Sequence, residues 1–386
     1  LSIGLSTMLL VGVQKIKLSA KESFSHSISG TDLIVGARSG DIQLLMYTVF
    51  RQGQPVANMS WDSVTAIKAF SEVDWVIPIS LGDSHNGYPV LASSVDYFKY
   101  YKFGKKRTLA FKSGQPFKSA FDVVLGSEVA KTLNYQLNDT IYLSHGLSAG
   151  NLPVHKNKGF KIVGILMPTG TPVDKTLHIS LEGTTALHMD WNQPTKASNA
   201  DLTPSEVTGC FVGLKSKFSI FSVQKRITGW ESEALMAIIP GVSLARMWGS
   251  IRTIDAAFFI ITIMVMIIAF TGLLLALFMS LNQRKRELSI LRSMGAHPSQ
   301  LFMIVCIESL MITVTGVVVG LILMVIIGAA LTPMLEASFG LILSFLSISI
   351  MEVYLVLAII VFGVLISFIP SWLAYKKGIT EGVISL

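Results

Sequence analysis

The apolar positions of this chain fall into four stretches, and a long polar region separates the first from the second. Residues 256–283, 309–335 and 353–375 contain no charged side chain. Each run exceeds the about 20 residues that a helix needs to cross the hydrocarbon core of a bilayer. The predicted transmembrane helices therefore cover residues 255–282, 301–333 and 350–375.

The chain begins with a shorter apolar stretch, residues 1–13, which Lys15 and Lys17 follow. This stretch is too short to span a bilayer. It also lacks the basic start and the small-residue cleavage site of a signal peptide. We interpret residues 1–16 as a first transmembrane helix that is truncated at its N-terminus.

The polar region, residues 17–231, alternates short β-branched runs with short helical patterns. Strands are predicted at 32–36, 73–80, 121–126, 140–144, 160–166 and 176–180. Helices are predicted at 61–70 and at 127–133, with Ser127 as the N-cap of the second. The predicted fold class is an α-helical membrane protein of four transmembrane helices, with a large α+β extracytoplasmic domain inserted between the first and the second.

An amphipathic segment, residues 232–254, leads from this domain directly into the second span. Its pattern predicts a stalk helix that Pro240 and Gly241 interrupt, because a proline inside a helix removes a backbone hydrogen bond. We expect these two residues to act as a hinge. The alternative is an ordinary packed helix.

The charged positions next to the spans predict the orientation. Arg284, Lys285, Arg286 and Arg292 follow the second span, and the tail 376–386 begins with two lysines. Short basic loops face the cytoplasm, whereas a long loop crosses the membrane regardless of its charge. The large domain therefore lies outside the cytoplasm.

Composition supports a membrane protein. The chain is 51% hydrophobic and only 14% charged, whereas soluble domains carry about 25% charged residues. The net charge of +7 comes mostly from the large domain and does not indicate nucleic-acid binding. Cys210 and Cys306 lie in a polar and an apolar region, which excludes a disulfide scaffold.

Few motifs in the large domain indicate catalysis. No phosphate-binding loop of the G-x-x-x-x-G-K-[ST] type occurs. Residues 146–150 match G-x-S-x-G around Ser148, but the helix that a nucleophile elbow requires does not follow. We favour a hairpin loop, with a serine hydrolase as the alternative. His145 and His155 are a weak candidate pair for a metal site; we predict solvated histidines and no metal.

Two features of the third span have open interpretations. Glu308 is an ionisable residue near the cytoplasmic end of the span, suited either to a proton relay or to pairing with the basic loop. Gly316 and Gly320 form a small-xxx-small motif, which permits close helix packing. The motif suits packing within the chain and homodimerisation equally well.

The segment 283–298 predicts a basic cytoplasmic helix. Leu288, Leu291 and Met294 recur on one face, and Gly295 is placed to end the helix. One interpretation is an anchor on anionic lipid. The other is a helix that docks into the groove of a partner protein.

The order of the spans and the run RKRELSILRSMGAHPSQLFMIVCIES resemble the FtsX-like permeases of the MacB superfamily, the type VII ABC transporters. Their turn reads approximately R-x-R-E-[IL]-x-[IL]-[LR]-[RK]-[AS]-[LM]-G-A, which this chain matches throughout. Glu308 fits the following F-x-x-E, with Val305 in place of the phenylalanine. By this resemblance, the residues that couple to an ATPase are Arg284, Arg286, Glu287, Leu288, Leu291, Arg292, Ser293, Met294, Gly295 and Ala296.

The large domain resembles the MacB periplasmic core domain in residues 123–144, 160–166 and 169–182. Asn138 stands where the family usually has a glycine before Asp139. The tail 379–386 lacks the family's usual Pro and Ala-Leu-Arg ending.

The resemblance implies a permease of the bacterial inner membrane, with its large domain in the periplasm. It implies no catalytic residue and no cofactor in this chain, because a separate cytoplasmic ABC ATPase dimer binds ATP and Mg²⁺. The expected partners are this ATPase, the lipid bilayer and a second copy or a homologous permease. A periplasmic adaptor, a lipoprotein or an outer-membrane channel can complete the assembly.

By the same resemblance, ATP hydrolysis drives mechanotransmission to the periplasmic domain, for the export of drugs, toxins or peptides or the release of lipoproteins. The alternative function is an envelope regulator that recruits or activates a periplasmic partner such as a hydrolase.

Overall fold

The computed structural model describes residues 2–104, 106–145, 154–188, 202–339 and 349–380. The chain forms two compact units. The α/β domain is Lys21–Ser250, and the helical unit combines Leu1–Ala20 with Ile251–Leu386. Helices α1 (Ser2–His26) and α9 (Pro240–Gln283) contribute residues to both units.

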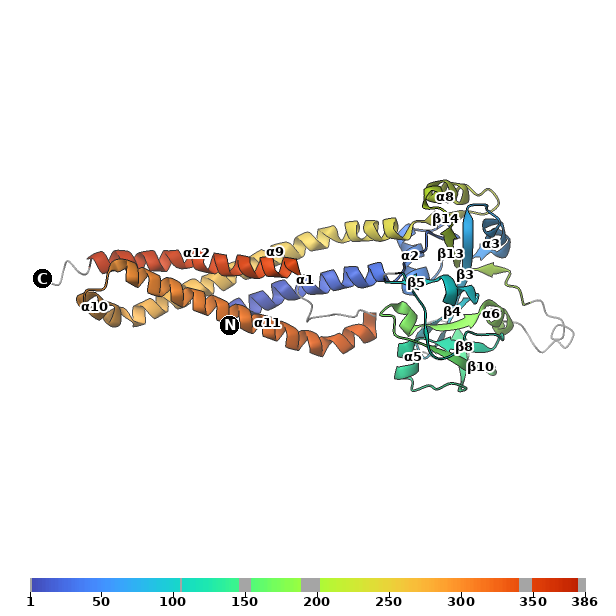
Figure 1. The fold of residues 1–386 in the computed structure, drawn as a ribbon, viewed down its shortest axis with the longest axis horizontal. Helices are drawn as coiled ribbons and strands as arrows, with labels where there is room; N and C mark the ends of the chain where they lie inside the picture. Colours follow the sequence, from blue (N-terminus) through green and yellow to red (C-terminus); the bar gives the residue numbers. More distant parts are fainter. Residues whose placement is uncertain (1, 105, 146–153, 189–201, 340–348, 381–386) are drawn as a thin grey trace. The chain divides into compact units, whose positions relative to one another are not determined.

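A mixed ten-stranded sheet forms the centre of the α/β domain (Figure 1). Its strand order is β14-β1-β13-β3-β4-β11-β8-β10-β7, and β9 pairs with β10 and β3. Two-stranded sheets join β12 to β2 and β5 to β6. The strands are β1 (Leu33–Ala37), β2 (Met59–Ser60), β3 (Val73–His85), β4 (Tyr88–Ser93), β5 (Lys102–Phe103), β6 (Arg107–Thr108), β7 (Phe111–Gly114), β8 (Asp122–Leu125), β9 (Thr140–His145), β10 (Val154–Leu166), β11 (Leu177–Ser180), β12 (Glu206–Val207), β13 (Gly209–Leu214) and β14 (Leu235–Ile238).

Short helices connect these strands. They are α2 (Asp41–Phe50), α3 (Trp61–Lys68), α4 (Asp96–Tyr100), α5 (Ser127–Thr132), α6 (Leu181–His188) and α8 (Ile220–Thr228), with 3-10 turns at Pro172–Lys175 and Lys217–Ser219. Ser60 caps α3, because its hydroxyl accepts a hydrogen bond from the amide of Ser63. The predicted N-cap of α5 is wrong by one residue: Gly126 is the cap, and Ser127 begins the helix.

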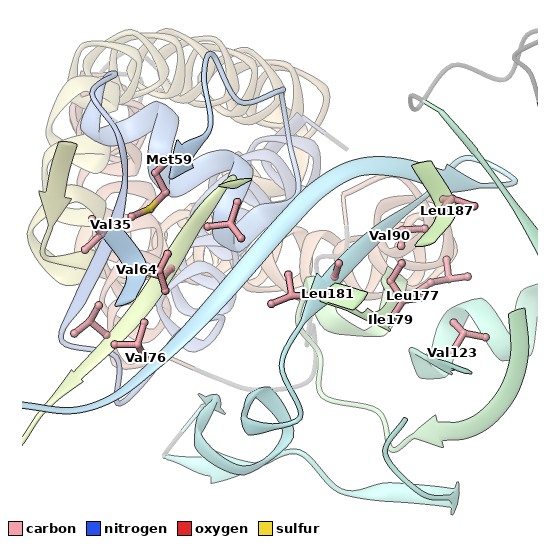
Figure 2. Packing of buried hydrophobic residues seen from close by; sticks show 14 of the residues in the cluster. Val35, Met59, Val64, Val76, Val90, Val123, Leu177, Ile179, Leu181 and Leu187 are labelled. Carbon is pink, nitrogen blue, oxygen red and sulfur yellow. The ribbon is translucent and has the colours of Figure 1, made fainter. Parts of the chain in front are cut away.

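The long strand β3 connects the two halves of the sheet. It pairs with β13 over its first residues and with β4 and β9 over its last. Figure 2 shows β3 passing between two groups of buried side chains, one around Val35 and Val64 and the other around Leu177 and Ile179. All six predicted strands and both predicted helices of the domain are confirmed.

The stalk segment differs from its prediction. Residues 235–238 form strand β14, which pairs with β1, so the helix expected from residue 232 is wrong up to Ile239. The apolar run Leu235–Ile238 fits a strand as well as a helix by periodicity. Backbone pairing with β1 makes this segment a strand.

The helical unit adds α10 (Lys285–Ser293), α11 (Pro298–Phe339) and α12 (Ile350–Thr380) to α1 and α9. Three segments are long and apolar enough to cross a membrane: Ala256–Gln283, Pro298–Thr332 and Ile350–Leu373. A shared core contains side chains from four helices, including Ile3, Leu273, Val317 and Ile359. Residues 2–16 thus form part of a helix that packs with these three.

The two glycines of the small-xxx-small motif face α1. A Cβ atom on Gly320 would clash with the backbone oxygen of Gly4, and one on Gly316 would lie 3.0 Å from Ile3. Such close approaches permit only hydrogen at these positions. The motif therefore lies within a close contact between two helices of the same chain.

A buried ion pair connects α1 to α12. The Lys15 ammonium lies 3.1 Å from each carboxylate oxygen of Glu352, and the two side chains are 4% and 8% exposed. Glu352 also accepts a hydrogen bond from the amide of Ser349. The sequence does not predict this pair, because 337 positions separate its members.

Candidate functional site

The segment that resembles the coupling helix forms α10, a short helix between two long ones. The backbone continues from α9 through Arg284, whose amide donates to Ser280 and whose carbonyl accepts from Leu288. Two hydrogen bonds of helical spacing therefore continue across Arg284, where a single turn residue separates α9 from α10. The helix is shorter than the predicted 283–298, because it ends at Ser293.

Gly295 ends α10 in a Schellman motif. Its φ is +95°, and the amide of Ala296 donates to the carbonyl of Leu291 at 3.1 Å. This left-handed position favours glycine, which explains why the helix ends before Gly295, the predicted cap, and does not extend to residue 298. Pro298 then begins α11, and the Gln300 side chain accepts a hydrogen bond from the amide of His297.

The surface of α10 combines exposed charge with an exposed apolar edge. Ile290, Leu291 and Met294 are 57%, 37% and 72% exposed and form this edge. Met294 lies four positions after Ile290 and three after Leu291, so it neighbours both on the helix surface. Leu288, predicted on the same edge, is half-buried. No described part of the chain covers the apolar edge.

The remaining predicted coupling residues surround the edge. Arg284, Arg286, Glu287, Ser293 and Gly295 are exposed, and Ala296 is half-buried. Arg292 lies within α10, but its side chain is outside the described set.

Glu308 on α11 contacts the junction between α9 and α10. Its carboxylate accepts a hydrogen bond from the Ser280 hydroxyl at 2.8 Å and lies 3.9 Å from the Arg284 guanidinium. Of the two interpretations of Glu308, the geometry favours pairing with the basic segment. The carboxylate links α11 to the last turn of α9.

The proposed hinge residues lie at the start of a helix. Pro240 is the first residue of α9, where the missing amide costs nothing. The helix runs for 44 residues to Gln283, about 66 Å at 1.5 Å per residue. The predicted interruption of a stalk helix at Pro240 is therefore wrong. A bend at this proline would lie between β14 and α9.

Contacts within the α/β domain hold the start of α9. Arg246 lies 2.5 Å from the Asp41 carboxylate at the start of α2, and Trp248 packs edge-on against Phe24. Phe24 also contacts Phe50 at the end of α2, with ring centroids 4.5 Å apart. The beginning of α9 is thus packed against α2.

Several candidate residues lie outside the described set. Ser148 falls in the segment 146–153, and the side chains of His145 and His155 are not described. Within the described residues, no three His, Cys, Asp or Glu side chains are close enough to hold a metal ion. Both cysteines are free thiols, Cys210 in β13 and Cys306 in α11.

The structure explains why asparagine can stand at position 138, where the family usually has glycine. Its φ is +74°, in the left-handed region. Asparagine tolerates this conformation better than other non-glycine residues. The turn before Asp139 therefore keeps the backbone conformation that favours glycine.

Two family models match the chain. The MacB-like periplasmic core domain matches residues 1–229, and the C-terminal domain of FtsX-like permeases matches residues 259–381. No curated protein matches the sequence.

Solved structures similar to the chain include two periplasmic or extracellular domains. The periplasmic region of MacB from Actinobacillus actinomycetemcomitans is 12% identical, with 57% of this chain and 94% of that chain covered and a TM-score of 0.37. The extracellular domain of the noncanonic ABC-type transporter YknZ from Gram-positive bacteria is 10% identical, with 53% and 98% covered and a TM-score of 0.32.

The MacB-like model alone matches more than half of the chain, and the two models together account for both units. The chain belongs to the family of FtsX-like permeases with a MacB-like periplasmic core domain, membrane components whose large domain is periplasmic.

Proposed function

We propose that this chain is the permease of a type VII ABC transporter in a bacterial inner membrane, with four transmembrane helices, and that a separate cytoplasmic ABC ATPase drives it through α10. The family generally works with such an ATPase. The observation that carries the proposal is the exposed apolar edge of α10, Ile290, Leu291 and Met294. Exposed apolar residues beside arginines are typical of a helix that binds a protein groove.

In this proposal, α9 transmits the movement of α10 to the periplasmic domain. An unbroken helix carries an axial displacement from Gln283 to Pro240, and the Arg246–Asp41 and Trp248–Phe24 contacts pass it to α2. The permease acts with a second copy or a homologous permease. Its work is the efflux or extraction of periplasmic or membrane-associated substrates, such as drugs, toxins, peptides or lipoproteins.

The apolar edge is tested by charge insertion. Leu291→Asp and Met294→Asp should abolish co-purification with the ATPase and its stimulation, because each places a charge in the bound groove. Ser289→Asp adds the same charge at another exposed position of α10 and serves as the matched control. Unchanged stimulation in the two edge variants, with normal membrane insertion, would contradict the proposal.

The same variants separate ATPase docking from lipid anchoring. If α10 only anchors the chain on anionic lipid, the aspartates should weaken binding to vesicles that contain phosphatidylglycerol and leave ATPase stimulation intact. If α10 docks on the ATPase, stimulation is lost in detergent without anionic lipid as well.

The transmission step is tested at Gly249, which lies inside α9. A Cβ atom at this position would have no neighbour within 4 Å apart from the surrounding helix itself. Gly249→Pro should break the helix, because proline removes a hydrogen bond and clashes with the preceding turn. We expect the ATPase to bind normally while transport is lost. Gly249→Ala, which preserves the helix, is the control; transport by the proline variant at the control level would contradict transmission through α9.

A further inference from the structure

The α/β domain contains a buried cation at the end of α2. Arg51 is 8% exposed, and its Nε and Nη1 atoms have no hydrogen-bond partner in the described chain. None of the ion pairs formed by the described residues includes it. A buried charge without a partner costs several kcal/mol of stability in general, so its presence requires an explanation.

The two rings next to Arg51 do not neutralise it. Burial, together with the positive charge of Arg51, lowers the pKa of His178 to about 3, so this imidazole is neutral at pH 7. Burial raises the pKa of Tyr97 to about 12, against the opposing effect of Arg51, so this hydroxyl is also neutral. The guanidinium thus lies among uncharged rings.

The backbone of Arg51 indicates that its side chain is needed there. Residue 51 has φ +59° and ψ +28°, and the amide of Gln52 donates to the carbonyl of Met46. Arg51 thus takes the left-handed position after the end of α2, where glycine is the usual residue. For a non-glycine residue this conformation costs about 1 to 2 kcal/mol. Strained residues of this kind concentrate at ligand sites.

Arg51 also lines a cavity of about 310 Å³, whose wall includes Tyr47, Gln54, Asn58 and Asp83. The volume lies at the lower end of the range of ligand pockets. A second cavity of about 540 Å³ shares Leu81, Gly82 and Asp83 with the first. The two cavities therefore share part of their lining.

We propose that Arg51 anchors a ligand site in this cavity, which binds the carboxylate of a small organic acid or of a peptide C-terminus. A guanidinium binds a carboxylate through charge-assisted hydrogen bonds, and Arg51 has N–H donors without a partner in the described chain. The carboxylate of Asp83 in the same wall disfavours a second negative charge, so a monoanion binds better than a phosphate dianion. The apolar wall residues Pro55, Val56 and Val90 contact the body of the ligand.

The experiment uses the full chain in detergent at pH 7, with isothermal titration calorimetry. The probes are acetate, N-acetyl-alanyl-alanine, the C-terminal amide of that dipeptide and inorganic phosphate. We expect the acids to bind and the amide and phosphate to bind at least tenfold more weakly. Tighter binding of the dipeptide than of acetate would identify a peptide C-terminus, and equal binding a free small acid.

Arg51→Gly is the decisive variant. It should weaken acid binding at least tenfold while the melting temperature without ligand stays the same or rises, because glycine relieves both the strain and the buried charge. Arg51→Lys should bind at an intermediate level, since an ammonium lacks the planar fork. Arg38→Met is the control. Arg38 is exposed, and its guanidinium donates a hydrogen bond to the Thr228 carbonyl. This variant should leave the affinity for the acids unchanged.

Gln54→Glu gives a test that does not depend on folding of the arginine variants. Gln54 is an exposed residue of the cavity wall, and a carboxylate there should weaken acid binding severalfold. The proposal is overturned if no acid binds, if the amide binds as well as the acid, or if Arg51→Gly keeps the wild-type affinity. A large loss of melting temperature in Arg51→Gly with unchanged affinity would show a purely structural arginine.

Discussion

Among the described residues, each unit of the molecule buries one lysine or arginine almost completely, and the two charges have different surroundings. In the helical unit, Lys15 lies between the two oxygens of Glu352. In the α/β domain, Arg51 has two nitrogens without a partner and neutral rings around it. A charge that is neutralised within the chain stabilises a helix contact. For the charge of Arg51, which forms no ion pair within the described chain, we propose that a bound carboxylate supplies the counter-charge.

The largest expected effect comes from breaking the buried pair. Lys15→Met leaves the Glu352 carboxylate uncompensated and should lower the free energy of unfolding by about 3 to 5 kcal/mol. Thermal unfolding in detergent measures the effect. The double variant Lys15→Met with Glu352→Leu should recover most of the loss, because it removes both charges.

Lys17→Met is the matched control for this prediction, since Lys17 lies on the same helix and is only half-buried. A double variant whose loss equals the sum of the two single losses would show that the pair is not coupled. In that case the contrast with Arg51 would disappear.

A somewhat smaller effect is expected where α1 meets α11. Gly320→Ala places a methyl group against the Gly4 carbonyl, so the helices must separate, at a cost of about 1 to 3 kcal/mol. Gly12→Ala on α1 is the control, because its nearest atom, in Met324, lies 3.8 Å away. Equal melting temperatures for the two variants would contradict the close packing of α1 that the ion pair also requires.

The buried imidazole beside Arg51 predicts a pH dependence of the α/β domain. His178 is neutral in the folded state because burial and Arg51 lower its pKa from 6.5 to about 3. The unfolded chain binds a proton below pH 6.5, so stability is lost as the pH falls from 6.5 towards 3. The contribution is at most about 1.4 kcal/mol per pH unit.

His178→Leu should therefore reduce the slope of the unfolding free energy against pH between 6.5 and 4, as followed by near-ultraviolet circular dichroism. His297→Ala, at an exposed position before α11, should leave the slope unchanged. A slope in His178→Leu equal to that of the wild type would show that the imidazole is not the titrating group.

The smallest effect is expected at an exposed ion pair. Arg246 is 63% exposed on its side chain and pairs with Asp41, so Arg246→Met should cost less than about 1 kcal/mol. Salt should reduce this cost, whereas it should hardly change the effect of Lys15→Met. If Arg246→Met lowered the free energy of unfolding as much as Lys15→Met, exposure would not distinguish the Arg246–Asp41 pair from the Lys15–Glu352 pair.

The sequence predicted elements whose signals are local. The β-branched runs became β1, β3, β8, β9, β10 and β11, because a buried strand needs only its own alternating or continuous apolar pattern. The end of α10 was predictable for the same reason, since Gly295 supplies its left-handed position alone. The family motif placed this helix at the candidate coupling site.

The elements that were predicted wrongly depend on distant partners. Leu235–Ile238 has an apolar pattern that suits a helix or a strand, and pairing with β1 made it a strand. The stalk interruption at Pro240 was wrong because the segment before it became strand β14, so that the proline begins α9 instead of breaking a helix.

The sequence by itself determined the apolar spans, the strand-rich domain and the basic helix between the second and third spans, because each depends on residues a few positions apart. Only the tertiary structure decided that Lys15 meets Glu352, that Gly316 and Gly320 face α1, and that Arg51 is buried outside the ion pairs of the described residues. These features depend on burial and on contacts between distant residues. Burial sets the energetic importance of a charge, and no local pattern reports it.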